Sequence, residues 1–344
     1  MQTQLLPVTP SALALAGELI RSGALVAFPT ETVYGLGADA LNAEAVKRIF
    51  EAKGRPGDNP LIVHISAIDQ LAPLISGAPS PAARRLMDAC WPGPMTLIFP
   101  KSEIIPPAVT AGLDTVAVRY PVHPAAQALI DAAQRPVAAP SANRSGRPSP
   151  TAADHVMEDM AGRIPLILDG GPCDVGLEST VIDVTGETPR ILRPGGVTPE
   201  RVARICGGVV VDDAVLRPLR EGEKPRSPGM KYRHYAPSGA LTIVRGAPDA
   251  VAAAIRRMYD AALAEGKQPL ILTLTGHMAA YADRRCLPLG DGADEMARAM
   301  FAALRRADAL DADVLFSEAV PAEGVGLAVM NRLERAAGFN IVDV

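Results

Sequence analysis

The stretch Ala24-Leu-Val-Ala-Phe28-Pro-Thr-Glu-Thr-Val-Tyr-Gly-Leu-Gly37 sets the pattern from which the fold of this chain can be predicted. Its first five residues are apolar and predict a short strand, and a polar loop with hydroxyl side chains and glycines follows. A helix is predicted over residues 43–53, ended by Gly54. Strand, loop and helix in this order favour an α/β fold.

The same alternation continues to about residue 206. Short strands are predicted over residues 61–65, 95–99, 115–119, 137–139, 166–168, 180–184 and 190–192. Helices are predicted near residues 10–22, 81–90, 124–133 and 152–160. We therefore expect residues 1–206 to form one α/β domain, built on a twisted mixed sheet with helices.

The composition changes after this domain. Residues 216–238 show no periodicity and are rich in Pro, Gly and Arg, which predicts a linker over residues 207–238. Beyond it, strands predicted over 241–244, 270–273 and 314–317 alternate with helices over 248–265, 294–309 and 327–337. This regular alternation predicts a small Rossmann-like domain with a parallel sheet over residues 239–344.

Composition excludes several classes of protein. Of the 344 residues, 48% are hydrophobic and 21% are charged, so wholesale disorder is excluded. The net charge of −4 argues against a chain built to coat nucleic acid, and the 4% content of aromatic residues argues against a base-stacking surface. The four cysteines and five histidines are scattered, so we expect reduced thiols and no metal site made by protein ligands.

The N-terminal residues contain neither a basic region nor a long apolar run, so no signal peptide is expected. No window reaches the ~18 apolar residues of a membrane span. We therefore expect a cytoplasmic protein that has no membrane partner.

The familiar nucleotide-binding sequence patterns are either absent from this sequence or lie in an unsuitable position. A P-loop pattern is absent. Gly35-Leu-Gly37-Ala-Asp-Ala40 matches the Gly-x-Gly-x-x-Ala pattern of dinucleotide sites, but residues 29–34 separate it from the preceding predicted strand. Because that fingerprint needs a tight turn from strand to helix, the sequence disfavours a dinucleotide site.

Basic residues recur in the polar loops that flank these strands. Each one alone has an ordinary interpretation, such as a surface charge or a helix C-terminus. Together they lie beside glycines, prolines and hydroxyl side chains in a chain of negative net charge, at Lys53, Arg55, Arg119, Arg193, Lys231 and Arg233. Fixed cations beside backbone donors and hydroxyls are what a triphosphate requires.

These segments resemble the YrdC-like family. The resemblance rests on Lys53-x-Arg55, on Ser141-x-Asn143 and on the stretch from Phe28 to Gly37. Further matches are Trp91-Pro-Gly-Pro-Met-Thr-Leu97, Val118-Arg-Tyr-Pro121, Glu178-Ser-Thr180 and the linker from Ser227 to Pro237. That linker and the extra α/β domain are similar to the long, two-domain members of the family.

The resemblance implies a reaction in which L-threonine, bicarbonate and ATP give threonylcarbamoyl-AMP and pyrophosphate. A carbamate oxygen would attack the α-phosphorus of ATP. The product would serve tRNA threonylcarbamoyladenosine modification at the adenosine beside the anticodon. A separate transferase would take it over, so contact of this chain with tRNA is expected to be weak or indirect. Mg2+ would accompany ATP, held by phosphate oxygens and water.

The resemblance also implies roles for individual residues. The catalytic set is Lys53, Arg55, Ser141 and Asn143. The ATP-binding set is Lys53, Arg55, Asn59, Thr115, Ser141, Ser149, Arg193, His234 and Tyr235. The threonine-binding set is Thr32, His64, Arg119, Ala139 through its backbone, and Ser179. The linker would act as a lid over the nucleotide, and His64 is a candidate general base by its chemistry alone.

Two other functions stay open at this point, besides the disfavoured dinucleotide-dependent oxidoreductase. One is carbamoyl-adenylate transfer in hydrogenase maturation, although the acyl-phosphatase and zinc-finger regions of such proteins are not seen here. The other is a non-catalytic RNA-binding module, which predicts steeply salt-dependent RNA affinity and no release of pyrophosphate.

Overall fold

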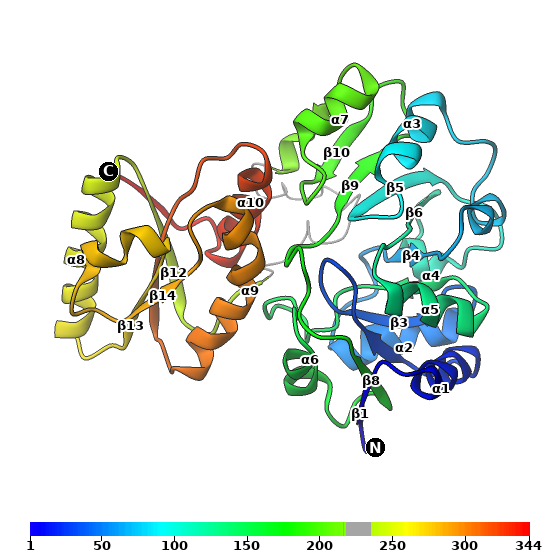
Figure 1. Ribbon diagram of the computed structural model, residues 1–344, viewed down its shortest axis with the longest axis horizontal. Helices are drawn as coiled ribbons and strands as arrows, with labels where there is room; N and C mark the ends of the chain where they lie inside the picture. The colour runs from blue at the N-terminus through cyan, green and yellow to red at the C-terminus, as the bar shows by residue number, and fades with distance from the viewer. Residues whose placement is uncertain (216, 218–234) are drawn as a thin grey trace. The chain divides into compact units, whose positions relative to one another are not determined.

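The computed structural model describes residues 1–215, 217 and 235–344, which form two compact units. The first unit contains the chain up to Ser145 and from Ser149 to the segment that is not described. The second contains Gly146–Pro148 and, beyond that segment, the chain to Val344. Each unit has its own sheet and helices (Figure 1). Most of the predicted lid, with His234, lies outside the described residues.

The first unit is built on an eleven-stranded sheet. Its strands are β1 (Gln4–Pro7), β2 (Val26–Phe28), β3 (Gly35–Asp39), β4 (Ile62–His64), β5 (Met95–Pro100), β6 (Thr115–Arg119), β7 (Val137–Ala139), β8 (Leu166–Asp169), β9 (Thr180–Asp183), β10 (Arg190–Arg193) and β11 (Val210–Val211). They lie in the order β1-β8-β2-β3-β7-β4-β6-β5-β9-β10-β11 and pair in both parallel and antiparallel fashion. The predicted mixed sheet is confirmed.

Seven α-helices and two 3-10 helices connect these strands within the described part of the unit. They are α1 (Pro10–Arg21), α2 (Ala43–Lys53), α3 (Pro81–Cys90), α4 (Pro107–Thr110), α5 (Pro124–Ala133), α6 (Ala153–Met160), α7 (Pro199–Cys206), η1 (Ile68–Leu74) and η2 (Asp213–Val215). The predicted bounds of α2, α3 and α5 are confirmed. Thr9 caps α1 through its side chain, and Gly54 ends α2 as expected, with φ of 60°.

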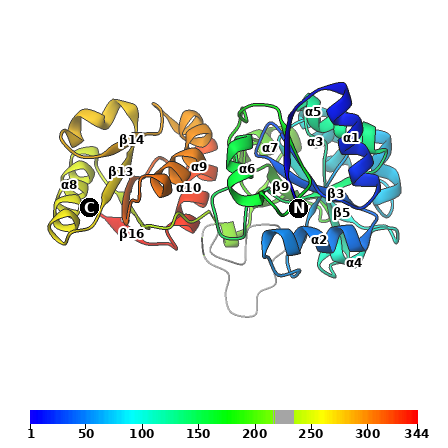
Figure 2. The same cartoon turned by 90° about the horizontal axis from the view of Figure 1, so that it is seen from below.

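Side chains of the sheet alternate between two cores. Val26 and Phe28 of β2 pack with α1 and α5, whereas Ala27 between them belongs to the larger core on the other face. Figure 2 shows α1 and α5 on one side of this part of the sheet and α2 and α4 on the other. The sheet is therefore the middle layer between two sets of helices.

Strand β3 corrects one expectation. The sequence predicted a loop through Gly35 and Gly37, but these residues form a buried strand between β2 and β7. A Cβ atom at Gly37 would lie 2.8 Å from a methyl group of Val137 and 3.0 Å from the ring of Phe28. Glycine lets this strand pass close to large neighbours. Because the Gly-x-Gly pattern lies in a strand, it does not form the strand-to-helix turn of a dinucleotide site.

The second unit contains a five-stranded, all-parallel sheet, as predicted. Its elements are β12 (Ala240–Arg245), α8 (Pro248–Ala264), β13 (Pro269–Thr273), η3 (Thr275–Tyr281), β14 (Cys286–Pro288), α9 (Ala293–Ala309), β15 (Val314–Glu318), α10 (Val325–Ala336) and β16 (Ile341–Asp343). Helix α8 covers one face, and α9 and α10 lie together on the other (Figure 1). The sequence did not predict β14 and β16, which are three residues long and lie at the two edges.

The sheet of the first unit reaches further along the chain than predicted. The linker was expected from residue 207, but β11 pairs in parallel with β10 at the edge of the large sheet. The apolar run Val209-Val-Val211 explains this pairing, since Val favours an extended, half-buried strand. Among the described residues, no helix has the length and apolar character needed to cross a membrane.

Candidate active site

One face of the large sheet carries some of the candidate residues, among them His64 and Arg119. A small apolar cluster lies on this face, formed by Ile62, Ile98, Ala117, Val181 and Leu192. Their strand neighbours, such as Val63 and Val118, belong to the main core on the opposite face. His64, Thr96 and Arg119 each lie two residues from a member of the cluster on the same strand, so they share its face. Strand alternation thus brings together polar groups that are distant in sequence.

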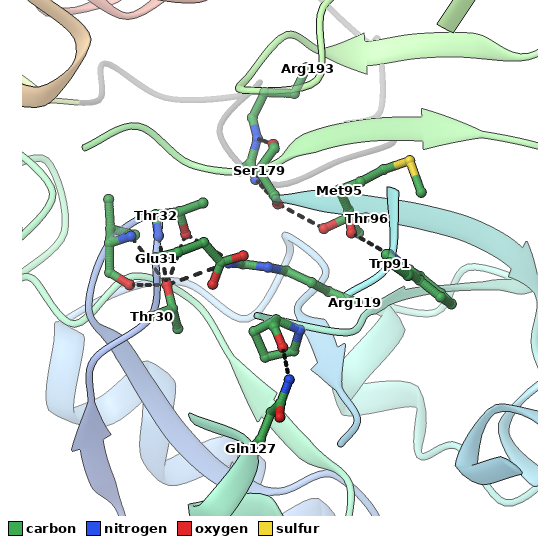
Figure 3. A network of polar contacts seen from close by, with 12 residues as sticks. Thr30, Glu31, Thr32, Trp91, Met95, Thr96, Arg119, Gln127, Ser179 and Arg193 are labelled. Carbon is green, nitrogen blue, oxygen red and sulfur yellow. Dashed lines mark hydrogen bonds and ion pairs between the residues drawn. The ribbon is translucent and has the colours of Figure 1, made fainter. Parts of the chain in front are cut away.

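Arg119, at the end of β6, is held by the loop that follows β2 (Figure 3). Its Nη1 donates to Oγ1 of Thr32 at 2.9 Å, and its Nη2 lies 2.7 Å from Oε1 of Glu31 and 3.5 Å from Oγ1 of Thr30. Arg119 and Glu31 are both buried. A buried arginine needs a carboxylate or phosphate partner, and Glu31 supplies a carboxylate.

His64 is the neighbour of Arg119 across the β4–β6 pairing. Its Nδ1 lies 3.1 Å from the carbonyl oxygen of Ile62, and its ring packs edge-on against Phe28. Burial, reinforced by the positive charge of Arg119, lowers the pKa of His64 from 6.5 to about 3. The imidazole is therefore neutral at pH 7 and a poor general base, because efficient bases titrate near the working pH.

Ser179 connects Thr96, on this face, with Arg193 at the end of β10. Its Oγ lies 2.7 Å from Oγ1 of Thr96, and its carbonyl oxygen accepts from Nε and Nη2 of Arg193 at 3.1 and 3.0 Å. Figure 3 shows Ser179 between Thr96 and Arg193. Thr96 is also the cross-strand neighbour of Arg119. Ser179 and Arg193, predicted to bind different substrates, are thus in direct contact.

The Lys53-x-Arg55 and Ser141-x-Asn143 motifs meet in the structure. Lys53 is the last residue of α2, and its Nζ donates to the carbonyl oxygens of Ser141 and, at 2.6 Å, of Asn143. Oγ of Ser141 donates to Oδ1 of Asn143 at 2.6 Å, so the two side chains of the Ser141-x-Asn143 turn are bonded to each other. The backbone N–H of Ser145 donates back to the carbonyl oxygen of Lys53. The end of α2 and the loop after β7 therefore form one hydrogen-bonded assembly.

The loop after β2 ties this assembly to Arg119. Tyr34 accepts a backbone hydrogen bond from Ala142 at 2.8 Å, and its own N–H donates to Pro150. Two residues earlier, Thr32 contacts Arg119. The loop over residues 29–34 thus contacts both the Ser141-x-Asn143 segment and Arg119, the arginine predicted to bind threonine.

Asn59 and Ser149 are both fully buried. Oγ of Ser149 donates to Oε1 of Glu178 at 2.6 Å. Neither the amide oxygen nor the amide nitrogen of Asn59 has a hydrogen-bond partner among the described residues. Buried polar atoms are nearly always paired, so an amide in this state indicates a place where a ligand or water completes the bonding.

The remaining predicted residues are Thr115, Arg55, Tyr235 and Ala139. Thr115 lies at the start of β6, four residues before Arg119, and lines a pocket of about 190 Å³ with Asp114, Asp183 and Thr185. Arg55 is half-buried in the loop after α2. Tyr235 belongs to the second unit, where its ring packs 5.2 Å from that of Phe301. Ala139, by contrast, ends β7 opposite Ile62 of the apolar cluster, as a backbone contact to a ligand on this face requires.

The sequence did not assign roles to Thr30, Glu31 or Thr96. Thr30 and Glu31 lie in the quoted loop, but a loop sequence alone does not show which side chains turn inward. The place of Thr96 on this face could have been predicted from strand alternation, because Thr96 precedes Ile98 by two residues and therefore shares its face.

Metal ligation is limited within the described part of the chain. No three or more His, Cys, Asp and Glu side chains lie together there in an arrangement that could hold a metal ion.

Comparisons with known proteins identify the family. Residues 18–195 match the Sua5/YciO/YrdC family, described as "Telomere recombination". Residues 197–338 match the family described as "Threonylcarbamoyl-AMP synthase, C-terminal domain". The two matches together cover both units of the chain.

Similar proteins extend over nearly the full length. The threonylcarbamoyl-AMP synthase of Pyrococcus abyssi is 48% identical over 332 residues, covering 96% of each protein. That of Bacillus subtilis is 47% identical over 333 residues, covering 96% of this chain and 94% of the relative. A crystal structure of Pyrococcus abyssi Sua5 complexed with L-threonine matches with a TM-score of 0.94 and 47% identity, covering 99% of this chain and 100% of that one. The chain therefore belongs to the Sua5/YciO/YrdC family and, within it, to the two-domain threonylcarbamoyl-AMP synthases.

Proposed function

We propose that this threonylcarbamoyl-AMP synthase uses L-threonine, bicarbonate and ATP, releases pyrophosphate, and supplies the first step of tRNA threonylcarbamoyladenosine modification. The observation that carries the proposal is that Lys53 hydrogen-bonds to Ser141 and Asn143. The same unit contains Arg119 with its contacts to the loop after β2. A cation held among backbone and hydroxyl groups suits phosphate, and a buried arginine suits a carboxylate.

Threonine would bind through Arg119. Its guanidinium would hold the α-carboxylate, while the hydroxyl groups of Thr32 and Ser179 offer hydrogen bonds to the remaining polar groups. Support comes from the Pyrococcus abyssi relative, whose structure is described as complexed with L-threonine. His64, neutral because of its lowered pKa, would serve as a hydrogen-bonding group rather than as a base.

ATP would bind through the Lys53 assembly. Lys53 and Arg55 would hold the triphosphate, and the unpaired amide of Asn59 would complete its hydrogen bonds on the nucleotide. Thr115 has a different environment, since Asp114 and Asp183 line the same pocket. Carboxylates repel phosphate but accept hydrogen bonds from amino and hydroxyl groups, so Thr115 would contact the adenosine part.

The reaction needs positioning and charge neutralisation more than covalent catalysis. The threonine ammonium loses a proton, and the resulting amine forms a C–N bond with CO2, or with bicarbonate as water leaves, to give a carbamate. A carbamate oxygen then forms a bond to the α-phosphorus as the bond from that phosphorus to pyrophosphate breaks. Lys53, Arg55 and Arg193 would neutralise charge on the phosphates. Mg2+ bound with ATP would neutralise part of the same charge, with ligands mostly from phosphate and water. A separate transferase would then carry the threonylcarbamoyl group to tRNA.

The test is release of pyrophosphate from ATP by the full-length protein, with threonine and then bicarbonate omitted. We expect release to require both, and mass spectrometry to identify threonylcarbamoyl-AMP as the other product. Release without threonine or without bicarbonate would reject the proposed set of substrates. Steeply salt-dependent RNA binding without pyrophosphate release would favour the RNA-binding alternative.

A further inference from the structure

Glu31 is a buried carboxylate for which the proposed reaction has no use so far. It lies in the loop between β2 and β3, and its side chain and that of Arg119 are only 4% and 5% exposed. Its Oε1 is 2.7 Å from Nη2 of Arg119. Its backbone carbonyl oxygen accepts from the N–H of Val175 at 2.8 Å, so the loop that carries the carboxylate is itself anchored.

The contacts of Arg119 engage its two terminal nitrogens and leave its Nε–H uncommitted among the described residues. Its terminal nitrogens contact Glu31, Thr30 and Thr32, as Figure 3 shows. Its Nε has no hydrogen-bond partner among the described residues. The three loop residues therefore hold the tip of the side chain, while the Nε–H keeps its bonding capacity for a further acceptor.

Hydrogen bonds among its own residues close the loop that carries Glu31. Oγ1 of Thr30 donates to the carbonyl oxygen of Val33 at 2.7 Å and lies 2.9 Å from Oγ1 of Thr32. The N–H of Thr32 donates to Oγ1 of Thr30 at 3.1 Å. Glu31 sits between these two threonines, so its carboxylate is carried on a turn closed by its own neighbours.

The positive charge of buried Arg119 is a second reason for its pairing with Glu31. A guanidinium removed from water is costly unless a carboxylate or phosphate lies beside it. Among the described residues, Glu31 is the carboxylate that forms an ion pair with Arg119. It allows Arg119 to stay buried, charged and oriented before any substrate carboxylate arrives, which lowers the cost of binding.

We propose that Glu31 is the positioning residue for recognition of the amino-acid carboxylate: it fixes the Arg119 guanidinium and does not contact the substrate itself. The inference rests on the proposed function, because it assumes that Arg119 binds the carboxylate of threonine. A rival role is direct contact between Oε2 of Glu31, which no described residue hydrogen-bonds, and the ammonium group of threonine.

The experiment compares two ligands on three variants of the full-length protein. L-Threonine carries both a carboxylate and an ammonium group, and 3-hydroxybutyrate keeps the carboxylate and hydroxyl but lacks the ammonium. Dissociation constants for both and for ATP are measured with the wild type, Glu31→Gln, Glu31→Asp and Asp39→Asn. Asp39 is a matched control, since it is a buried carboxylate near an arginine, Arg135, in the same unit.

We expect Glu31→Gln to raise the dissociation constants of threonine and 3-hydroxybutyrate by the same factor, at least about tenfold, with the dissociation constant of ATP unchanged. Glu31→Asp should recover part of the loss because it restores the charge, and Asp39→Asn should change nothing. Loss of threonine affinity alone would overturn the proposal in favour of an ammonium contact. Tighter threonine binding, unchanged binding, or equal loss of ATP affinity would also overturn it. A wild-type protein that binds no threonine would instead reject the proposed function.

Discussion

Nζ of Lys53 lies 2.6 Å from the carbonyl oxygen of Asn143, although 90 positions separate the two residues in the chain. The contact places the C-terminal end of α2 against the loop after β7, and a second bond to the carbonyl oxygen of Ser141 reinforces it. Lys53 is therefore both a candidate phosphate ligand and the residue that holds the Ser141-x-Asn143 turn in place.

Replacing Lys53 by Met should affect stability as well as ATP binding. The change leaves the carbonyl oxygens of Ser141 and Asn143 without this donor, and an unsatisfied buried polar group costs about 1–3 kcal/mol. We expect the free energy of unfolding to fall by about 2 kcal/mol in urea titrations, with ATP binding lost in calorimetry. Lys47→Met, an exposed lysine on the same helix, is the control and should change neither. Loss of ATP binding at full stability would contradict the dual role of Lys53.

Arg119→Ala should abolish threonine binding while ATP affinity stays within a factor of about two. Removing one partner of a buried charged pair typically costs 2–5 kcal/mol, which corresponds to a rise of about 30-fold or more in the dissociation constant of threonine. Arg119→Lys keeps a charge beside Glu31 and should fold better, but it loses the planar fork and should still bind threonine poorly. Equal losses of threonine and ATP affinity in both variants would refute the assignment of Arg119.

Serine should be a poor but measurable substrate. It differs from threonine by one methyl group, and a methyl pocket discriminates by only ~1–3 kcal/mol, or roughly 10–200-fold. We expect this ratio between the kcat/KM values of threonine and serine in the pyrophosphate-release assay. Equal turnover of the two amino acids would argue against a shaped methyl pocket in the site.

His64 should make the protein sensitive to acid. Burial lowers its pKa from 6.5 to about 3, so between these pH values the unfolded chain binds a proton that the folded protein does not. The stabilisation from neutral His64 is fully present above pH 6.5 and is lost progressively as the pH falls, by about 2 kcal/mol at pH 5. His64→Gln should therefore lose less stability than the wild type between pH 7 and 5 in urea titrations. Parallel stability curves for the two proteins would show that His64 is not the group responsible.

Gly17→Ala tests the packing of α1 against α5. A Cβ atom at this position would lie 2.6 Å from backbone atoms of Ala132, which cannot move as a side chain can. Overpacking of this kind costs about 1–3 kcal/mol, and the better helix propensity of Ala offsets up to ~1 kcal/mol of it. We expect a net loss of about 2 kcal/mol in thermal or urea unfolding. Gly186→Ala, at an exposed site with open space around it, should have no effect.

Much of the secondary structure could be predicted because its signals are local. Helix α2 begins at the Asn42 cap and ends at the left-handed Gly54, and both signals lie within a few residues of the ends. Strand β3 could not be predicted in the same way, since glycines usually mark turns. Residues 35–39 form a strand because they pair with β2 and β7, and the close approach of Phe28 and Val137 explains why glycine occupies positions 35 and 37.

The sequence proposes the candidate site as a set of residues, and it does not predict the contacts among them. Arg119 required an anionic partner on physical grounds, yet nothing in the sequence selected Glu31 from the acidic residues of the chain. The contact between Ser179 and Arg193 was likewise hidden, because it depends on the bulged pairing of β9 with β10.

The order of residues by itself determined the alternation of strands and helices, the absence of familiar nucleotide motifs and the list of basic and hydroxyl side chains. These properties depend on periodicity, caps and residue type, each of which acts over a short stretch of chain. Only the tertiary structure decided that Lys53 holds the Ser141-x-Asn143 turn and that Glu31 faces Arg119. The physical reason is that strand register and the face to which each side chain points are fixed by pairing between distant segments.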